Sequence, residues 1–508
     1  MAEPLSAAVD IFANLALGFG VAVTLKNLLY CFIGVFLGTL IGVLPGIGPV
    51  ATVAMLLPLT FNLDPATAMI MLAGIYYGAQ YGGSTTAILV NIPGESSSVV
   101  TTLDGYQMAR QGRAGPALGI AAIGSFIAGS FATLVVALFS PPLAEIALKF
   151  QPADYFSLMV FGLVGAVVLA RGSLRKAVAM VVLGLMLGLI GTDVNSGTIR
   201  FTFGIPALAE GISFVALAMG MFGIAEVITN LEQRGKSREV FTSGLGSALP
   251  SRDDLKRSLW SIARGTGLGS ILGILPGGGA LLASFAAYTI EKKVAKAPRN
   301  FGDGDIRGVA APESANNAGA QTSFIPMLTL GVPSNPTMAL MIGALMIQGI
   351  QPGPQVMTQR PELFWGIVAS MWIGNLFLLA LNLPMIGLWV RLLAVPYRLL
   401  FPAILVFCCI GVFTINNNAS DLFQLVLFSG LGYLLLKLGC EPAPLILGLV
   451  LGPMMEEYLR RALLISLGDP IVLVTSPISL GFLLAAAGLL ASIAVPLIRT
   501  KREEALKE

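Results

Sequence analysis

Residues 42–51 of the chain read GVLPGIGPVA, and residues 273–282 read GILPGGGALL. Each stretch interrupts a long apolar run with proline and several glycines. Proline removes a backbone hydrogen-bond donor and glycine frees the backbone torsions, so both residue types break helices. The sequence therefore predicts a pair of helix breaks. Their residues are Pro45, Gly46, Gly48, Pro276, Gly277, Gly278 and Gly279.

Two further motifs recur in the same order and at nearly equal separations. The tripeptide GAQ occurs at residues 78–80 and again at 319–321, and NIPGES at residues 91–96 has a counterpart in GVPSNP at 331–336. Three pairs in register predict an internal duplication. Many transporters consist of two such repeats, and interrupted segments at corresponding positions form the substrate site.

Composition places the chain in a membrane. Of its 508 residues 56% are hydrophobic and 11% are charged, and the mean hydropathy is +0.84. Several apolar runs approach or exceed the roughly 20 helical residues that cross a bilayer. They lie at residues 117–139, 155–170, 176–190, 205–228, 399–414 and 471–498. The predicted fold class is therefore an all-α, polytopic transmembrane protein with two internal repeats and broken or re-entrant helices.

Charge placement predicts the domain boundaries and part of the topology. The longest polar stretch, residues 229–257, is basic and is expected to face the cytoplasm. It divides a first transmembrane repeat (1–228) from a second repeat with C-terminal helices (258–508). The other basic clusters lie at residues 110–113, 171–176, 292–307 and 499–507.

The basic cluster at residues 292–307 constrains the second break. One apolar segment, residues 262–290, separates this cluster from the central basic stretch. Both ends can face the cytoplasm only if the segment turns back at its Pro-Gly break as a re-entrant hairpin. The repeat predicts a matching hairpin at residues 28–59, opening on the opposite face. The two repeats are therefore expected to be inverted.

The polar residues around the breaks suit recognition of an anion. A helix that restarts after a break presents free N–H groups and a partial positive charge. Asn335 is a good N-cap before Pro336, and the serines of residues 96–98 could cap another helix. Pro312 and Glu313 are likewise expected to begin a helix.

Neutral donors near these starts can bind carboxylates without burying a formal charge, which is costly in a membrane. Exposed carbonyls and side-chain oxygens could also hold Na⁺. For any single Ser or Thr, packing between helices is the more frequent role. The predicted substrate- or cation-binding residues are Gln80, Ser84, Thr85, Thr86, Asn91, Ser96, Asn316, Asn317, Gln321, Thr322, Ser334 and Asn335.

The acidic residues divide into two groups. Glu95 and Glu313 lie within the polar stretches, where they could couple to H⁺ or a cation, or could cap helices or pair with arginines. Glu456 and Glu457 precede Arg460 and Arg461 at the spacing of local ion pairs.

The four cysteines lack CxxC spacing and are interpreted as packing residues. No residue pattern beyond a possible Na⁺ site predicts a metal or organic cofactor.

The stretches GVLPGIGPVATVAMLLP, YYGAQYGGSTTAILVNIPGE and APESANNAGAQTSFIPMLTLGVPSNP resemble the large membrane subunit of the tripartite tricarboxylate transporters. The resemblance covers nearly the whole chain. It implies carboxylate uptake, of citrate in the type members, across the bacterial inner (cytoplasmic) membrane. It also implies a periplasmic solute-binding protein, a small four-span membrane subunit, and a Na⁺ or H⁺ gradient as the driving force. The chain has no GxxxxGK[ST] phosphate loop, in agreement with transport that does not use ATP.

The mechanism expected from these features is a secondary transporter with elevator-type alternating access. A channel could use similar broken helices, and it remains an alternative. The chain has no histidine, which excludes Ser-His proteases and HExxH metalloproteases. A Ser-Lys dyad is left open, but the lysines all lie at or near loops, so the chain is not expected to be an enzyme. The bilayer is an expected partner and nucleic acid is not.

Overall fold

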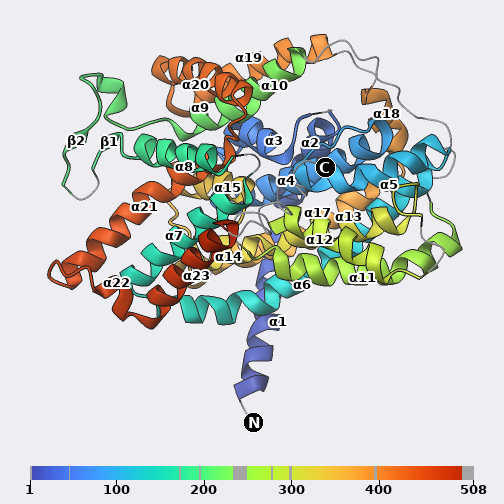
Figure 1. Cartoon of the computed structure of the whole chain (residues 1–508), viewed down its shortest axis with the longest axis horizontal. Coiled ribbons are helices and arrows are strands. Elements are labelled where there is room, and N and C mark those ends of the chain that lie inside the picture. The colour runs from blue at the N-terminus through green and yellow to red at the C-terminus, as the bar shows by residue number, and fades with distance from the viewer. Residues whose placement is uncertain are drawn as a thin grey trace.

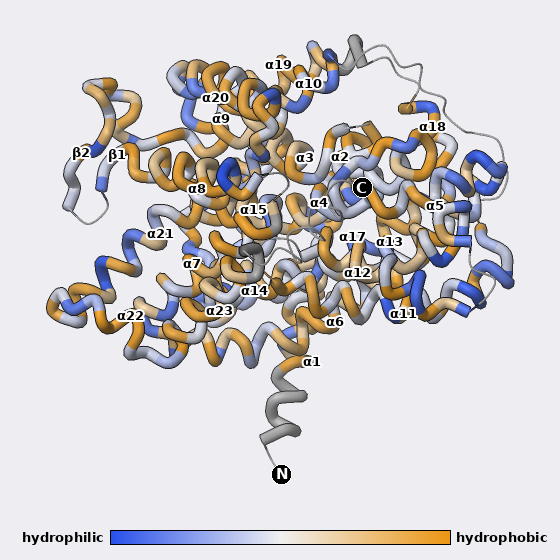
Figure 2. Tube along the Cα trace, in the orientation of Figure 1, coloured by the Kyte–Doolittle hydropathy of each residue, from blue (hydrophilic) through white to orange (hydrophobic). Residues whose placement is uncertain are grey.

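The computed structural model of the protein describes residues 3–44, 46–170, 173–193, 196–232, 249–275, 279–296, 300–393 and 397–494. These residues are almost entirely helical, which confirms the predicted all-α class (Figure 1). Orange, hydrophobic positions dominate the helices, and hydrophilic positions gather around α5 and α11 (Figure 2). Within the described residues, five helical segments are long and apolar enough to cross a membrane. They are Leu25–Gly42, Ala114–Ala147, Phe214–Glu232, Pro361–Asn382 and Ala419–Lys437.

The first repeat contributes the central helices of the molecule. A 3-10 turn at Leu57–Thr60 extends α3, and another at Ser96–Ser98 leads into α5. The helices are α1 (Glu3–Ala22), α2 (Leu25–Gly42), α3 (Pro49–Leu56), α4 (Pro65–Val90), α5 (Val99–Arg110) and α6 (Ala114–Ala147).

Between the repeats, the predicted span at residues 205–228 is wrong in its first part. That part contains a 3-10 turn starting at Pro206 and a residue at positive φ, Gly211, instead of α-helix, and the α-helix begins at Phe214. A π-helical stretch, Met219–Ile224, links α9 to α10. The elements are α7 (Pro152–Leu169), α8 (Leu174–Gly188), the antiparallel strands β1 (Gly191–Thr192) and β2 (Ile199–Arg200), a 3-10 turn (Pro206–Leu208), α9 (Phe214–Ala218) and α10 (Ala225–Glu232).

The second repeat follows residues 233–248, which lie outside the described residues. Because α10 ends at Glu232 and the next helix starts at Arg252, both ends of the predicted linker are helical. The helices are α11 (Arg252–Leu272), α12 (Gly279–Val294), α13 (Arg307–Thr322), α14 (Phe324–Leu330), α15 (Pro336–Ile347), α16 (Gln355–Gln359) and α17 (Pro361–Asn382).

The C-terminal helices complete the fold. A short turn separates α19 from α20, with Asn417 at positive φ between the two helices. The apolar run at residues 471–498 is not one helix, because it breaks at Ser476 before Pro477. The helices are α18 (Ile386–Leu393), α19 (Tyr397–Asn416), α20 (Ala419–Lys437), α21 (Ala443–Ile465), α22 (Val472–Thr475) and α23 (Pro477–Ala494).

Helices α11 and α12 form the predicted hairpin. Ser261 Oγ and Arg264 Nη2 of one arm each donate to Glu291 Oε1 of the other at 2.8 Å. At the turn, a Cβ on Gly279 would lie 2.8 Å from the carbonyl oxygen of Gly273. The break itself is confirmed because α11 ends at Leu272 and α12 starts at Gly279. The predicted break residues Pro276, Gly277 and Gly278 lie outside the described residues.

Helices α2 and α3 form the matching break in the first repeat. The first arm ends at Gly42 and the second starts at Pro49, while Gly46 adopts φ 82° in the turn. An ion pair between Lys26 and Asp64 joins the outer ends of the hairpin. Pro45, the remaining predicted break residue, lies outside the described residues.

Matching glycines pack each hairpin against its neighbour. On α2, Gly34, Gly38 and Gly42 follow one face, and a Cβ on any of them would lie within 2.5 Å of a backbone oxygen of α4. Along α11 and its C-cap, Gly265, Gly269 and Gly273 have the same spacing and the same relation to α13. Small residues at this spacing allow two backbones to approach closely. The three-dimensional structure thus repeats the sequence duplication.

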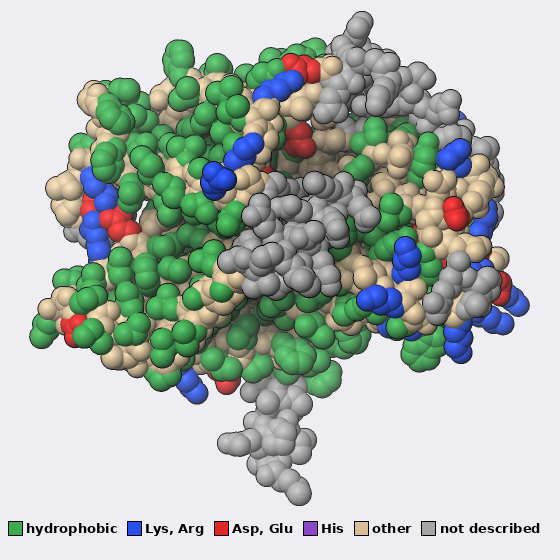
Figure 3. Space-filling view, viewed as in Figure 1, with side chains coloured by type: hydrophobic (Ala, Val, Ile, Leu, Met, Phe, Trp, Pro, Cys, Tyr) green, Lys and Arg blue, Asp and Glu red, His purple; other side chains and the backbone are tan. Residues whose placement is uncertain are grey.

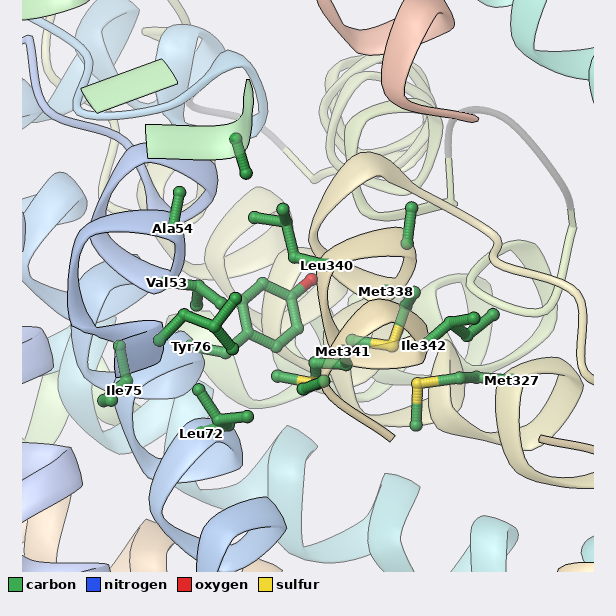
Figure 4. Packing of buried hydrophobic residues seen from close by; sticks show 14 of the residues in the cluster. Val53, Ala54, Leu72, Ile75, Tyr76, Met327, Met338, Leu340, Met341 and Ile342 are labelled. Carbon is green, nitrogen blue, oxygen red and sulfur yellow. The ribbon is translucent and has the colours of Figure 1, made fainter. Parts of the chain in front are cut away.

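The two repeats meet in the molecular core. Figure 4 shows the ring of Tyr76, from α4, between Val53 of α3 and the side chains of α15. Tyr76 is 2% exposed and Leu340 is fully buried. Because residues of α3 and α4 share this cluster with residues of α14 and α15, the polar ends of the same helices are held close together.

Three of the basic segments lie together at one end of the molecule. Arg113 pairs with Asp254 at 2.6 Å, and Gln111 donates to the carbonyl oxygen of Asp303 at 2.7 Å. Lys and Arg side chains gather mainly on the right of the face shown in Figure 3, while hydrophobic side chains cover much of the remainder. This arrangement agrees with a shared cytoplasmic side for the three segments.

Candidate functional site

A cavity of about 440 Å³ lies where the helix breaks of both repeats meet. Its size falls within the range of small-molecule sites. Its walls come from the turn before α3, the loop after α4, the first turn of α12 and the start of α15, with further residues from α10 and the loop before α21.

Three α-helices and the 3-10 turn that leads into α5 begin at this cavity. Gly48 is the N-cap of α3, and Glu95 precedes the turn that leads into α5. Ala280 lies in the first turn of α12, and Asn335 caps α15 by accepting a hydrogen bond from the N–H of Met338 at 3.0 Å. All four residues line the cavity. Free N–H groups and the helix dipoles therefore favour negative charge inside it.

A directed chain of side-chain hydrogen bonds forms part of the wall. Asn316 Nδ2 donates to Glu95 Oε1 at 2.7 Å, which turns Asn316 Oδ1 toward Gln80. Gln80 Nε2 donates to that oxygen at 3.4 Å. Gln80 Oε1 is left without a hydrogen-bond partner among the described residues, although Gln80 is only 1% exposed. An unpaired buried acceptor costs about 1–3 kcal/mol unless a ligand or water supplies a donor.

Carboxyl groups, but no Lys or Arg of the described residues, line the cavity. Glu95, Glu226 and Glu441 contribute acidic side chains from three different elements. A substrate that carries carboxylates would meet like charge here as well as helix N-termini. Its binding is therefore favoured when a proton or another cation accompanies it.

Of the predicted binding residues, Gln80, Ser96 and Asn335 line the cavity, together with Gly46 and Gly48 of the first break. Asn316 lies directly behind Gln80 through the hydrogen bond described above.

The other predicted binding residues lie elsewhere. Asn91 is exposed in a left-handed conformation at the end of α4. Ser84 and Thr85 border a separate small void. Four more are buried and bonded within the protein. Thr86 and Thr322 donate to backbone oxygens of their own helices, at Gly83 and Ala318, whereas Asn317 and Gln321 donate to side chains of neighbouring helices, Ser125 and Asn375. Ser334 is buried and donates weakly to the carbonyl oxygen of Ser323 at 3.5 Å.

Predictions about helix ends had mixed outcomes. The start at Asn335 and Pro336 is confirmed, and the i,i+4 pairs Glu456–Arg460 and Glu457–Arg461 are also confirmed. The predicted start at Pro312 and Glu313 is wrong, because α13 begins at Arg307 and contains Pro312 in its interior. Proline at this position removes the intrahelical hydrogen bond to the carbonyl oxygen of Gly308, and the helix continues through it.

Sequence reasoning missed several wall residues. Glu226 lies near the C-terminal end of the apolar run at residues 205–228, and an ionisable residue in such a run is a signal of function. Asn230, one helical turn further on, donates to the carbonyl oxygen of Gly46 at 3.0 Å and so anchors the first break. Tyr76, Ser97 and Thr337 complete the polar lining near α4, α5 and α15.

This geometry defines a polytopic membrane protein in which broken helices from two repeats enclose a polar cavity, an architecture used by secondary transporters. The chain belongs to the tripartite tricarboxylate transporter TctA family, whose model matches residues 28–447. The family resemblance predicted from the sequence motifs is thereby confirmed.

Two relatives from Agrobacterium vitis are similar to the chain. An uncharacterized 52.8 kDa protein in the TAR-I ttuC′ 3′ region is 57% identical over 499 residues, which are 98% of this chain and 99% of the relative. An uncharacterized protein in the TAR-II ttuC′ 3′ region is 59% identical over 242 residues, which are 47% of this chain and 99% of that relative. No solved structure matches the chain.

Proposed function

We propose that this protein is the large membrane subunit of a bacterial inner-membrane secondary transporter that takes up a carboxylate solute of the citrate type. The observation that carries the proposal is the convergence of three α-helix starts and one 3-10 turn on one cavity of about 440 Å³. Helix N-termini bind carboxylates through backbone N–H groups and dipole charge. The cavity joins both repeats, which is where substrate sites of such transporters form.

Neutral side chains would complete recognition of the substrate. Asn335 and Ser96 lie at two of the helix starts, and Gln80 lies between them with an unpaired acceptor oxygen. These groups bind a carboxylate or hydroxyl without a fixed positive charge. A carrier must release what it binds, and several moderate hydrogen bonds suit that requirement better than an arginine clamp.

The acidic lining supports coupling to a cation gradient. Glu95 and Glu226 would repel an incoming carboxylate unless a proton or Na⁺ entered with it. Coupled entry of the two species is symport. No organic cofactor forms part of this proposal.

The two hairpins support an elevator-like motion. Each hairpin packs along a neighbouring helix through closely approaching glycines, so hairpin and helix can move as one body. The cavity lies at the tips of both hairpins and would travel with them. A periplasmic solute-binding protein would deliver the carboxylate, and a small four-span subunit would complete the membrane complex.

Uptake of labelled carboxylates tests the proposal. Cells lacking their own citrate carriers would express this chain with its small subunit, with or without the cognate periplasmic protein, and with Na⁺ present or replaced by K⁺. The proposal predicts uptake of at least one carboxylate that requires the periplasmic protein and collapses with the cation gradient. Absence of uptake for citrate and for a panel of other di- and tricarboxylates would overturn it.

A further inference from the structure

A second site lies away from the cavity, in a small void of about 20 Å³ bordered by α4, α6, α13, the end of α17 and the start of α18. This volume holds one water-sized particle. Six polar side chains border the void: Tyr81, Ser84 and Thr85 of α4, Ser125 of α6, Glu313 of α13 and Asn382 at the end of α17. The rest of the lining is apolar.

Glu313 dominates the charge at this void. It is 1% exposed, and it accepts hydrogen bonds from Ser84 Oγ at 2.6 Å and Thr101 Oγ1 at 2.5 Å. Among the described residues, no Lys or Arg forms an ion pair with it or borders the void. A buried carboxylate without a compensating positive charge is costly, so a cation in the void would stabilise it.

An unpaired hydroxyl faces the same void. Tyr81 is 5% exposed and its hydroxyl makes no hydrogen bond of good geometry within the described residues, although Ser125 lies close by. Asn382 Nδ2 donates to the carbonyl oxygen of Leu378 at 2.9 Å, which leaves Asn382 Oδ1 for another partner. These oxygens, like the carboxylate, are ligands for a hard cation.

We propose that Glu313, Tyr81 and the neighbouring hydroxyls bind one Na⁺ ion in this void. The site deepens the proposed function by locating the coupling cation. Ser84 lies one helical turn from Gln80 on α4, and Glu313 lies nearly one turn from Asn316 on α13. Na⁺ would therefore fix the two helices that carry the Gln80–Asn316 bond of the cavity wall and prepare that wall for the carboxylate.

Other titratable groups lie near the site, but each of the three described below has partners of its own and supplies no positive charge to Glu313. Glu95 lies toward the cavity and is held by Asn316. Asp104, one turn beyond Thr101 on α5, accepts hydrogen bonds from Tyr288 and from the backbone N–H groups of Gly302, Gly304 and Asp305. Glu291 pairs with Arg264. The positive charge of Arg264 is thus already engaged with another carboxylate.

Thermal unfolding of the purified full-length chain tests the site without any substrate. NaCl would be titrated against choline chloride at constant ionic strength. The proposal predicts a melting temperature that rises with Na⁺ and saturates, as expected for a ligand that binds the folded state. Glu313→Gln should weaken the apparent Na⁺ affinity by about 100-fold and Tyr81→Phe by about tenfold.

Tyr77→Phe is the matched control. Tyr77 lies one turn from Tyr81 on α4 and is also buried with an unpaired hydroxyl, but it does not border the void. This variant should keep the Na⁺ response. If Glu313→Gln does not fold, the Na⁺ response of Tyr81→Phe tests the site instead, because this substitution removes one hydroxyl and little volume.

Two results would overturn the site: a wild-type protein that does not respond to Na⁺, or one whose response survives both Tyr81→Phe and Glu313→Gln. In the first case, a melting temperature that changes with pH but not with Na⁺ would indicate that Glu313 binds a proton instead of Na⁺. Na⁺ binding by a protein that transports no carboxylate would retain the site and refute the proposed function, so the two failures are distinguishable.

Discussion

Replacing Asn335 with Asp changes the charge of the cavity while it keeps the helix cap. Asn335 caps α15 through its Oδ1, which accepts from the N–H of Met338 at 3.0 Å, and Asp is an equally good N-cap. The Nδ2 donates to Ser323 Oγ at 3.1 Å, so the variant loses one hydrogen bond worth about 1 kcal/mol. We therefore expect the Asn335→Asp protein to fold.

The added charge should strongly weaken carboxylate binding. A sphere with the volume of the cavity has a radius of about 5 Å, so a bound carboxylate would lie about that far from the wall. At an effective dielectric constant of about 20, two like charges at about 5 Å repel by about 3 kcal/mol. That energy corresponds to about two orders of magnitude in affinity for each unit of substrate charge.

Asn335→Ser is the matched control, because Ser caps the helix without adding charge. The assay is the concentration dependence of carboxylate uptake in cells that express each variant at equal level. We expect KM to rise by at least about 100-fold for Asn335→Asp and by no more than a few-fold for Asn335→Ser. An unchanged KM for a well-expressed Asn335→Asp protein would show that the substrate does not bind against the start of α15.

Two further predictions concern the cavity wall. Gln80→Ala removes the bond to Asn316 and should raise the KM for uptake by about fivefold or more, since a buried hydrogen bond contributes about 1 kcal/mol. The control is Gln321→Ala, at the equivalent position of the second repeat but outside the cavity, which should leave KM unchanged. Equal effects of the two variants would refute the assignment of Gln80 to the substrate site. Gly94→Ala would place a Cβ 2.3 Å from the Cα of Gly83. It should destabilise the protein by about 1–3 kcal/mol through overpacking, measured as a lower melting temperature, and a variant as stable as wild type would contradict this close approach.

Local chemistry made the helix breaks and one helix start predictable. Proline and clustered glycines can be recognised without knowledge of the fold, and the breaks before Pro49 and Gly279 follow from them. Asn335 before Pro336 is a cap signal of the same local kind. Pro312 carries a similar signal but lies inside α13, because residues before it already form the first turns of the helix.

The side of a helix that faces the cavity was not predictable. Gln80, Ser84 and Thr86 belong to one polar stretch of α4. In the fold Gln80 lines the cavity, Ser84 borders the small void, and Thr86 donates to a backbone oxygen of its own helix. These differences arise from the packing of α4 against α13 and α6, which a single sequence does not reveal. The predicted site was accordingly too broad.

Glu226 was missed for a related reason. It is far from the duplicated motifs in sequence, and the packing of α10 against the turn before α3 brings it to the cavity. Its position within an apolar run was nevertheless a usable signal, because ionisable residues in such runs are seldom incidental. The irregular segment before Phe214 was not predicted either, because its apolar composition suits a continuous helix equally well.

The most direct test of the central claim is a structure of the protein with the carboxylate identified by the uptake assay. The account predicts density for that molecule in the cavity between Gln80 and the start of α15, with its carboxylates against backbone N–H groups of α15 or α3. Density for the carboxylate at any other place, with this cavity empty, would contradict it.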